Sequence, residues 1–336
     1  MDYTLLGRTG LKASSLCFGT MSFGREADSS EAAAMYAAYR DRGINFFDCA
    51  DNYSKGKAEE ILCKLMAHER DDLIVTTKCF NPMGPDVNAR GANRRHILRN
   101  VEASLLRLGT DRIDILLMHR WDSTVPLEET LRALEDLVRD GKVLYLGASN
   151  YAAWQVAKGF VISERRGWAR FDVIQPMYSL VKRQAEVEIL PQARAEGLGV
   201  MTYSPVGGGV LSGKYGPDKR PEAARLLTDQ SYADRYSEDW VYETTGRFSA
   251  LAAARGHHPV SLAVAWVAAH PDITCPIVGA RNLDQLQPSL DALEIDITPG
   301  FRAEISALSR TPPPATGRFE ETVAAATGAG PERAGA

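Results

Sequence analysis

Residues 72–118 decide the fold: DLIVTT (72–77) is followed by ANRRHILRNVEASLLRLG (92–109) and then by IDILLM (113–118). The first and last segments are short, apolar and rich in β-branched residues, as strands covered on both faces must be. The middle segment has the apolar spacing of an amphipathic helix and ends in glycine, a common helix terminator. Together they predict a strand–helix–strand unit, which joins two parallel strands of one sheet.

The same alternation continues along the whole chain. Helical patterns lie between the apolar runs; SSEAAAMYAAYRDRG (29–43), for example, opens on Ser29 as an N-cap and ends on a C′ glycine. Alternation alone leaves an open, doubly wound sheet possible, but eight strands favour an α/β fold closed as a (β/α)8, or TIM, barrel. The other six predicted strands are LCFG (16–19), INFF (44–47), VLYLGA (143–148), FDVI (171–174), LGVMT (198–202) and ITCPIV (273–278).

Three segments interrupt this rhythm. YTLLGRTGLKASS (3–15) has the pattern of a β-hairpin that plugs one end of the barrel. Residues 203–240 form a long Gly-, Pro- and Asp-rich loop after the seventh strand, longer than an ordinary connection and therefore expected to be functional. The sequence predicts one barrel domain over residues 1–311. The tail, residues 312–336, is expected to pack loosely or to cover the barrel mouth only in part.

Composition excludes several functional classes. The chain has 336 residues, 45% of them hydrophobic, and a net charge of −4, so it offers no basic field for nucleic acid. No apolar stretch reaches membrane-spanning length and no secretory leader is evident, which predicts a cytoplasmic protein with no membrane partner. The cysteines are odd in number and lack CxxC spacing, so reduced thiols are expected and no metal site is predicted; they are Cys17, Cys49, Cys63, Cys79 and Cys275.

Polar residues collect at the ends of the predicted strands. Asp48, Lys78 and His119 follow the second, third and fourth strands, and Tyr53 comes five residues after Asp48. Each has an ordinary structural explanation by itself: a helix cap, a solvated lysine, a packed histidine or a surface aromatic. The carboxyl ends of barrel strands share one face, however, and the four side chains supply an acid, a cation beside it, an anion behind the cation and a neutral hydrogen-bonding group.

Seven segments resemble the aldo-keto reductase superfamily, in the family's order. HRWD and SGKY further resemble the branch that holds channel β-subunit-like and aryl-alcohol-dehydrogenase-like members, and the similarity runs from Leu5 to about Leu293. The segments are DCADNYSKGKAEEILCKLM (48–66), IVTTK (74–78), DILLMHRWD (114–122), GASNY (147–151), IQPMYSL (174–180), TYSPVGGGVLSGKY (202–215) and PIVGARNLDQL (276–286).

The resemblance implies NADPH-dependent reduction of an aldehyde or ketone to the alcohol, in a reversible reaction. Hydride comes from the nicotinamide, and Tyr53 gives the proton. A free phenol has a pKa of roughly 10, so Lys78 is expected to lower it, with Asp48 holding the lysine. His119 would hydrogen-bond the substrate oxygen and orient it.

The resemblance also implies a set of NADP-binding residues, and no GxGxxG follows the first strand to suggest a Rossmann fold instead. Asp48 and the segment Gly19, Thr20 and Met21 would lie beside the cofactor. Ser289 stands where the family usually has Asn, which puts the adenine contacts in doubt. The remaining expected positions are Ser149, Asn150 and Gln175 at the nicotinamide amide, Tyr203 stacked on its ring, Ser204, Pro205, Leu211, Gly213 and Lys214 along the pyrophosphate, Gly279 and Arg281 at the adenosine phosphate, and Gln285 and Ser289 near the adenine.

The substrate pocket is expected to have an apolar wall, because it would be built from residues 203–240, the tail and the loops around Met21, Phe23, Tyr53, Phe80 and Trp121. Such walls favour a small-molecule carbonyl that is aromatic or bulky and alicyclic, such as a terpenoid, steroid-like or toxin ketone. Two other functions remain open: a barrel that senses NADPH with little turnover, and a metal-dependent hydrolase or isomerase. The sequence leaves monomer and homo-oligomer equally possible.

Overall fold

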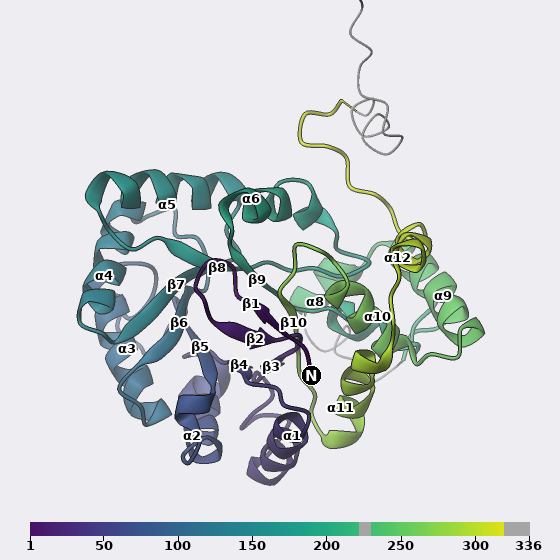
Figure 1. Ribbon diagram of the computed structural model, residues 1–336, viewed down its shortest axis with the longest axis horizontal. Helices are drawn as coiled ribbons and strands as arrows, with labels where there is room; N and C mark the ends of the chain where they lie inside the picture. Colours follow the sequence, from purple (N-terminus) through teal and green to yellow (C-terminus); the bar gives the residue numbers. More distant parts are fainter. Residues whose placement is uncertain (222–229, 319–336) are drawn as a thin grey trace, which may run out of the picture.

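A closed barrel of parallel strands forms the centre of the computed structural model, which describes residues 1–221 and 230–318. Its strands are β3 (Cys17–Gly19), β4 (Phe46–Asp48), β5 (Ile74–Cys79), β6 (Ile113–Met118), β7 (Val143–Ser149), β8 (Phe171–Gln175), β9 (Gly199–Thr202) and β10 (Cys275–Val278). Their order is β10-β3-β4-β5-β6-β7-β8-β9, and β10 pairs with both β3 and β9 (Figure 1). This closure confirms the predicted (β/α)8 barrel and excludes the doubly wound sheet.

Helices cover the outside of the barrel (Figure 1). The described helices are α1 (Ser29–Asp41), α2 (Lys57–Leu65), α3 (Arg94–Leu108), α4 (Leu127–Arg139), α5 (Ala153–Arg166), α6 (Ile189–Glu196), α8 (Gln230–Tyr236), α9 (Asp239–Ala254), α10 (Pro259–Ala268), α11 (Leu283–Leu290) and α12 (Pro299–Ser306). Short 3-10 helices lie in the connections: η1 (Tyr53–Gly56), η2 (Arg70–Asp72), η3 (Gln184–Glu186), η4 (Gly207–Ser212) and η5 (Asp291–Glu294).

Helix α1 shows how local sequence sets an element's bounds. Its N-cap is Asp28, so the prediction of Ser29 was wrong by one residue. The Asp28 carboxylate accepts hydrogen bonds from the backbone N–H groups of Ser30 (2.8 Å) and Glu31 (2.9 Å), which are free at the start of a helix. The predicted glycine after the helix is confirmed, since Gly43 has φ +77°, a conformation that glycine adopts without strain.

Two apolar layers stabilise the barrel. Side chains that point inward fill its interior, among them Cys17, Phe46, Ile115, Leu117 and Met201. Their neighbours along the strands point outward and pack against the helices, among them Phe18, Phe47, Leu116 and Val200. This alternation is the two-residue period of a strand, and it fills most of the strand interiors with apolar side chains.

The predicted N-terminal hairpin is present and closes one end of the barrel. It consists of β1 (Tyr3–Leu5) paired antiparallel with β2 (Lys12–Ser14), and in Figure 1 it crosses the barrel centre. Leu6 leaves β1 and is fully buried in the barrel interior. A Cβ on Gly199, the first residue of β9, would lie 2.6 Å from a Leu6 methyl carbon, so glycine is required for this approach. The hairpin therefore plugs the N-terminal end and leaves the C-terminal end as the mouth.

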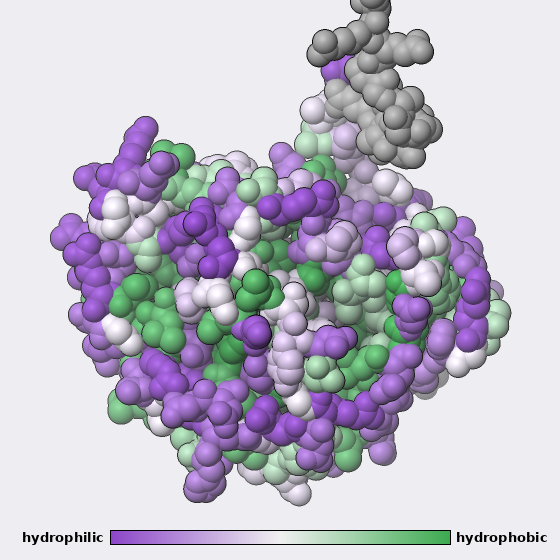
Figure 2. All heavy atoms as spheres, in the orientation of Figure 1, coloured by the Kyte–Doolittle hydropathy of each residue, from purple (hydrophilic) through white to green (hydrophobic). Residues whose placement is uncertain are grey.

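The face that carries the hairpin is mixed in character. Figure 2 shows hydrophilic residues along its margin and hydrophobic residues nearer the middle. The side chains of Tyr3 and Leu5 on β1 are 49% and 57% exposed. None of the helices in the described part of the chain is long and apolar enough to span a bilayer.

The two other unusual segments are described in part. The segment that follows β9 contains three helical elements: η4, α8 and the start of α9. The expectation of one long loop over 203–240 was therefore too simple. Residues 222–229 lie outside the described chain. Residues 312–318 of the tail are exposed or half-buried, and residues 319–336 lie outside the described part. The domain boundary at residue 311 stays a prediction.

Candidate active site

Three neighbouring strands bring the four predicted catalytic side chains to the barrel mouth. Asp48 is the last residue of β4, Lys78 lies near the end of β5, and His119 follows β6 directly. Tyr53 opens η1 after a short connection from β4. The next two residues, Ser54 and Lys55, have φ of +50° and +57°, an unusual conformation for side-chain-bearing residues that is typical of functional sites.

The ammonium of Lys78 is the centre of this cluster. Its Nζ donates to both oxygens of Asp48, at 2.8 and 2.7 Å, and to the backbone carbonyl of Cys49 at 2.7 Å. The hydroxyl of Tyr53 lies 3.2 Å from the same nitrogen. Lys78 is fully buried and Asp48 is nearly so. Buried charges of this kind are tolerated only when paired and fully hydrogen-bonded, as they are here.

Asp48 is also held by two neutral side chains. The hydroxyl of Thr76, on β5, donates to Oδ1 at 2.8 Å, and the amide of Gln175, at the end of β8, donates to the same oxygen at 2.8 Å. Gln175 was expected at the cofactor, whereas the role of Thr76 was missed by the sequence analysis. A threonine in a strand is so common that its identity carries no signal of this contact.

Burial decides the acidity of Tyr53. Burial raises the pKa of its phenol, Lys78 lowers it and the nearby Asp48 carboxylate raises it, and together these effects raise the pKa to about 12. The expected lowering by Lys78 is therefore present, but it does not set the net direction, because burial raises the pKa by more and the Asp48 carboxylate adds to that rise. Burial lowers the pKa of Lys78 itself, while Asp48 and Tyr53 raise it by more, so the lysine stays protonated.

His119 is a neutral imidazole. Burial, and then the charge of Lys78, lower its pKa to about 3. The side-chain amide of Asn81 lies 3.0 Å from Nδ1. The rings of His119 and Tyr53 meet edge to face at 6.2 Å between centroids. Asn81, three residues after Lys78, was missed by the sequence analysis, because only the fold brings it to the histidine.

The predicted nicotinamide residues form one hydrogen-bonded chain. The Tyr203 hydroxyl donates to Oδ1 of Asn150 at 2.6 Å, and the Asn150 amide donates to the Ser149 hydroxyl at 3.0 Å. Ser149 in turn donates to the backbone carbonyl of Gln175 at 3.0 Å. The Gln175 amide reaches Asp48, so this chain is continuous with the catalytic cluster. Adjacent ends of β7, β8 and β9 thus present amide and hydroxyl groups of the kind that bind a carboxamide.

A second group of predicted cofactor residues gathers between β3 and β10. The Ser22 hydroxyl donates to the backbone carbonyl of Ala280 at 2.6 Å. A Cβ on Gly279 would lie 2.7 Å from the carbonyl oxygen of Gly19, so glycine is required at this approach. The residues that follow β3, Thr20 and Met21, therefore lie beside the loop that leads into α11.

The predicted phosphate-binding residues lie at η4 and before α11. Arg281 is exposed and its charge acts on Tyr215, which places the two segments together. Neither Arg281 nor Lys214 pairs with an acidic group in the described part of the chain. Leu211 and Pro205 are buried, and Ser204 and Gly213 adopt φ of +60° and +81°. Two cations that have no acidic partner among the described residues, beside a glycine-rich turn, are suited to an anionic ligand.

The adenine positions are less uniform. Gln285 is exposed on α11, and its backbone N–H is capped by Asn282 at 3.0 Å. Ser289, one turn further, is 5% exposed, and no described hydrogen bond joins it to the other predicted positions. The structure therefore brings Gln285 to an accessible surface and buries Ser289.

Three aromatic side chains pack together beyond the carboxyl ends of β6 and β7. Trp121 packs edge to face against Tyr151 (5.3 Å between centroids) and Trp154 (5.7 Å). Trp154 is 60% exposed and was missed by the sequence analysis. The expectation that Phe23 forms part of the pocket wall was wrong, because Phe23 is fully buried and packs edge to face on Phe18 in the layer outside the barrel.

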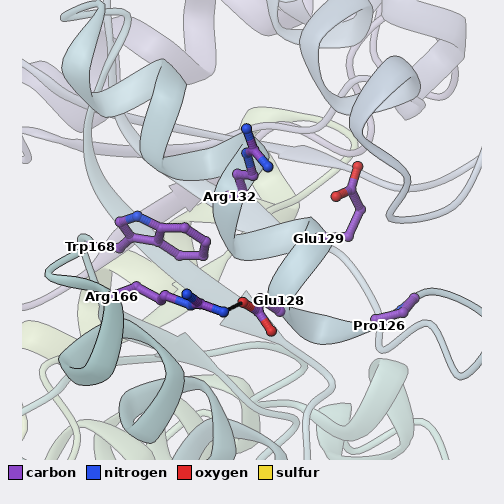
Figure 3. A pocket seen from close by; sticks show the side chains of 6 residues that line it. All are labelled: Pro126, Glu128, Glu129, Arg132, Arg166 and Trp168. Carbon is purple, nitrogen blue, oxygen red and sulfur yellow. Dashed lines mark ion pairs between the residues drawn. The ribbon is translucent and has the colours of Figure 1, made fainter.

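A hollow of about 370 Å³ lies on the outer surface, away from the cluster of catalytic side chains. Figure 3 shows its charged lining, including the ion pair between Arg166 and Glu128 at 2.5 Å. Its other lining residues are Pro126, Glu129, Arg132 and Trp168. None of the predicted site residues contributes to it, so it is not part of the candidate active site.

The fold and the polar cluster at the mouth place the chain among TIM-barrel oxidoreductases. Residues 15–310 match the model of the aldo/keto reductase family, and the chain belongs to that family. Its general activity is that of an oxidoreductase acting on carbonyl groups with a nicotinamide cofactor.

Full-length relatives agree with this assignment. The chain is 38% identical to "Uncharacterized oxidoreductase YrpG" of Bacillus subtilis, over 88% of this chain and 92% of that protein. It is 35% identical to "Probable voltage-gated potassium channel subunit beta" of Oryza sativa subsp. japonica, over 94% and 99%. It is 33% identical to "Versiconal hemiacetal acetate reductase" of Aspergillus parasiticus, over 89% and 94%. These names match the branch that the sequence motifs resemble.

Proposed function

We propose that the protein reduces an aldehyde or ketone to the alcohol with NADPH, reversibly, and that Tyr53 provides the proton. One observation carries this proposal: the Tyr53 hydroxyl lies 3.2 Å from a fully buried ammonium, Lys78, which Asp48 holds at 2.7 and 2.8 Å. Carbonyl reduction develops negative charge on oxygen, and a proton donor fixed beside a buried cation stabilises that charge.

Each of the four residues has a distinct part. Tyr53 gives its proton to the carbonyl oxygen, and Lys78 stabilises the phenolate that remains. Asp48 keeps Lys78 charged and fixed. Neutral His119 donates a hydrogen bond to the same oxygen and so orients the substrate toward Tyr53. NADPH, when bound, supplies the hydride.

The residues present fit such a cofactor. Ser149, Asn150 and Gln175 offer amide and hydroxyl groups for the nicotinamide carboxamide. Tyr203, whose hydroxyl donates to Asn150, offers an aromatic ring on which the nicotinamide would stack. The segments Ser204–Pro205 and Leu211–Lys214 suit the pyrophosphate. Arg281, without an acidic partner among described residues, suits the additional phosphate that distinguishes NADPH from NADH.

We further propose an aromatic or bulky alicyclic substrate, such as a terpenoid, steroid-like or toxin ketone. The cluster of Trp121, Tyr151 and Trp154 supports this, because flat apolar side chains favour flat or bulky apolar ligands. A relative at 33% identity is named as the reductase of versiconal hemiacetal acetate, which is in keeping with a large substrate.

The test is loss of NADPH absorbance with a panel of aromatic and aliphatic aldehydes and ketones. Wild type should turn over bulky aromatic carbonyls. Tyr53→Phe should bind NADPH normally and lose on the order of 10²–10³ in kcat, as for loss of one preorganised donor. Near-full turnover by Tyr53→Phe would show that another group is the acid.

A second candidate function is sensing of NADPH with little turnover. It is favoured by the relative from Oryza sativa, whose name is that of a channel subunit. In that case NADPH should bind tightly, but the protein should reduce every carbonyl in the panel only slowly. The complete set of Asp48, Tyr53, Lys78 and His119 argues for the enzyme.

A further inference from the structure

A second cluster of polar side chains is buried directly behind the active-site lysine. Asp51 lies in the connection after β4, Cys79 is the last residue of β5, and His96 is in the first turn of α3. One potential ligand atom from each residue lies within 4.8 Å of the other two. Asp51 and Cys79 are fully buried and His96 is 4% exposed.

Two atoms of this cluster have no hydrogen-bond partner among the described residues: Oδ1 of Asp51 and Nε2 of His96. A buried polar atom without a partner costs about 1–3 kcal/mol, so such atoms usually indicate a bound water or ion. Here two of them occur in one cluster, together with a thiol.

The chemistry of these atoms indicates a cation. The His96 ring donates a hydrogen bond to the backbone of Asn81, and because Nε2 has no partner the donor is Nδ1. Nε2 therefore carries a lone pair. Burial raises the pKa of Asp51 to about 7, and in its ionised form the carboxylate offers only lone pairs. The sulfur of Cys79, which is hydrogen-bonded to the side chain of Asn100, has lone pairs as well. Three potential electron-pair donors therefore lie within 4.8 Å of one another.

The surroundings match those of a metal site. A ligating histidine almost always donates its other ring N–H to a carbonyl or carboxylate, and ligating carboxylates are themselves hydrogen-bonded. His96 meets the first condition through Asn81. Asp51 meets the second, because the amide of Asn100 on α3 donates to its other oxygen, Oδ2, at 2.8 Å.

We propose that Asp51, Cys79 and His96 form a binding site for a divalent transition metal of the zinc class. Carboxylate, thiolate and imidazole are the ligands that Zn²⁺ takes, and a water molecule completes the tetrahedron. Binding replaces the proton of the Cys79 thiol, which is released to solvent. Tetrahedral zinc ligands lie about 3.5 Å apart, so donor atoms that are now up to 4.8 Å apart draw together by up to about 1.3 Å on binding.

This site is separate from the proposed catalytic groups and does not rest on the proposed function. It was not predicted from the sequence, because its ligands lie far apart along the chain and lack the close spacing of a zinc motif. It is adjacent to the catalytic cluster, however. Cys79 follows Lys78, and the backbone N–H of Asp51 donates to the carbonyl of Lys78 at 3.2 Å.

The test uses the full chain without an affinity tag, stripped with a chelator, loaded with Zn²⁺ and desalted. We expect about one equivalent of zinc per chain by mass spectrometry, and a thiolate-to-cobalt charge-transfer band when Co²⁺ is used instead. Cys79→Ala should bind at least about tenfold more weakly. The matched control is Cys63→Ala, which removes a half-buried thiol on α2 outside the cluster and should bind as wild type does.

Wild type that keeps no zinc and shows no cobalt band would overturn the proposal and leave water or a shared proton in the cluster. Equal zinc retention by Cys79→Ala and wild type would overturn it as well. Circular dichroism checks the fold of each variant. If Cys79→Ala does not fold, Asp51→Asn, which has the same shape, provides the same test, since it removes one ligand charge and should weaken binding in the same direction.

Discussion

The side-chain amide of Asn81 donates a hydrogen bond to Nδ1 of His119 over 3.0 Å. An amide nitrogen can only donate, so Nδ1 accepts and the proton of the neutral ring lies on Nε2. With burial and Lys78 lowering the pKa of His119 to about 3, this tautomer holds throughout the neutral range. Asn81 therefore makes His119 a hydrogen-bond donor toward the substrate.

Replacing Asn81 should weaken catalysis through the histidine. In Asn81→Leu the proton can move to Nδ1, and we expect kcat to fall by about tenfold with unchanged NADPH affinity. Nitrogen NMR of the imidazole should show a mixture of tautomers in place of one. A single Nε2–H tautomer in Asn81→Leu would mean that another group fixes the ring.

Alcohol oxidation should report the acidity of Tyr53, because it requires the phenolate. Since the pKa is raised to about 12, the oxidation rate should climb with pH throughout the neutral and moderately alkaline range. Reduction requires the protonated phenol and should stay nearly constant there. Lys78 lowers this pKa. In Lys78→Met the rise of the oxidation rate with pH should therefore begin at a higher pH.

The single lysine variant also leaves Asp48 buried without its cation, at a cost of about 3–5 kcal/mol of folding stability. Asp48→Asn/Lys78→Met removes both charges and serves as the control for folding, checked by thermal unfolding. If folded Lys78→Met had the same pH dependence of the oxidation rate as wild type, Lys78 would not act on Tyr53.

Coenzyme choice should depend on Arg281. Arg281→Ala should weaken NADPH binding by about 1.5–3 kcal/mol, the range of a charged hydrogen bond, and leave NADH nearly unchanged. Fluorescence titration with both coenzymes measures this difference. Arg165→Ala, an exposed arginine on α5, is the control. An equal loss for both coenzymes would assign Arg281 a structural part instead.

Substrate size should depend on Trp154, which packs on Trp121 and remains 60% exposed. An aromatic contact contributes about 0.5–1.5 kcal/mol, so Trp154→Ala should raise KM for a bulky aromatic ketone by about 2- to 10-fold. KM for a small aliphatic aldehyde should not change. Trp168→Ala, in the outer hollow of Figure 3, is the matched control. An equal rise in KM for both substrates would show that Trp154 does not contact the bulky substrate.

The barrel could be predicted from local sequence because its signals are local. A buried strand such as IDILLM (113–118) and the helix before it are each recognisable within a few residues. Local signals also placed Asp48, Lys78 and His119 at strand ends, and parallel strands bring those ends to one face. The helix cap at Asp28 was missed by one residue, because serine and aspartate are both good caps.

Tertiary structure decided what depends on distant contacts. The pKa of Tyr53 follows from how deeply the barrel buries it and how Asp48 shares the charge of Lys78, and neither is visible in a linear sequence. Phe23 looked like a pocket residue, and only packing against Phe18 showed that it belongs to the core. Asn81 beside His119, and Asp51 beside Cys79 and His96, are brought together by the parallel pairing of β4, β5 and β6 and by the packing of α3. Periodicity and motifs are local, so they identify the family and the strand ends from the sequence alone. Strand pairing, burial and charge balance depend on contacts between distant residues, so only the folded chain sets them.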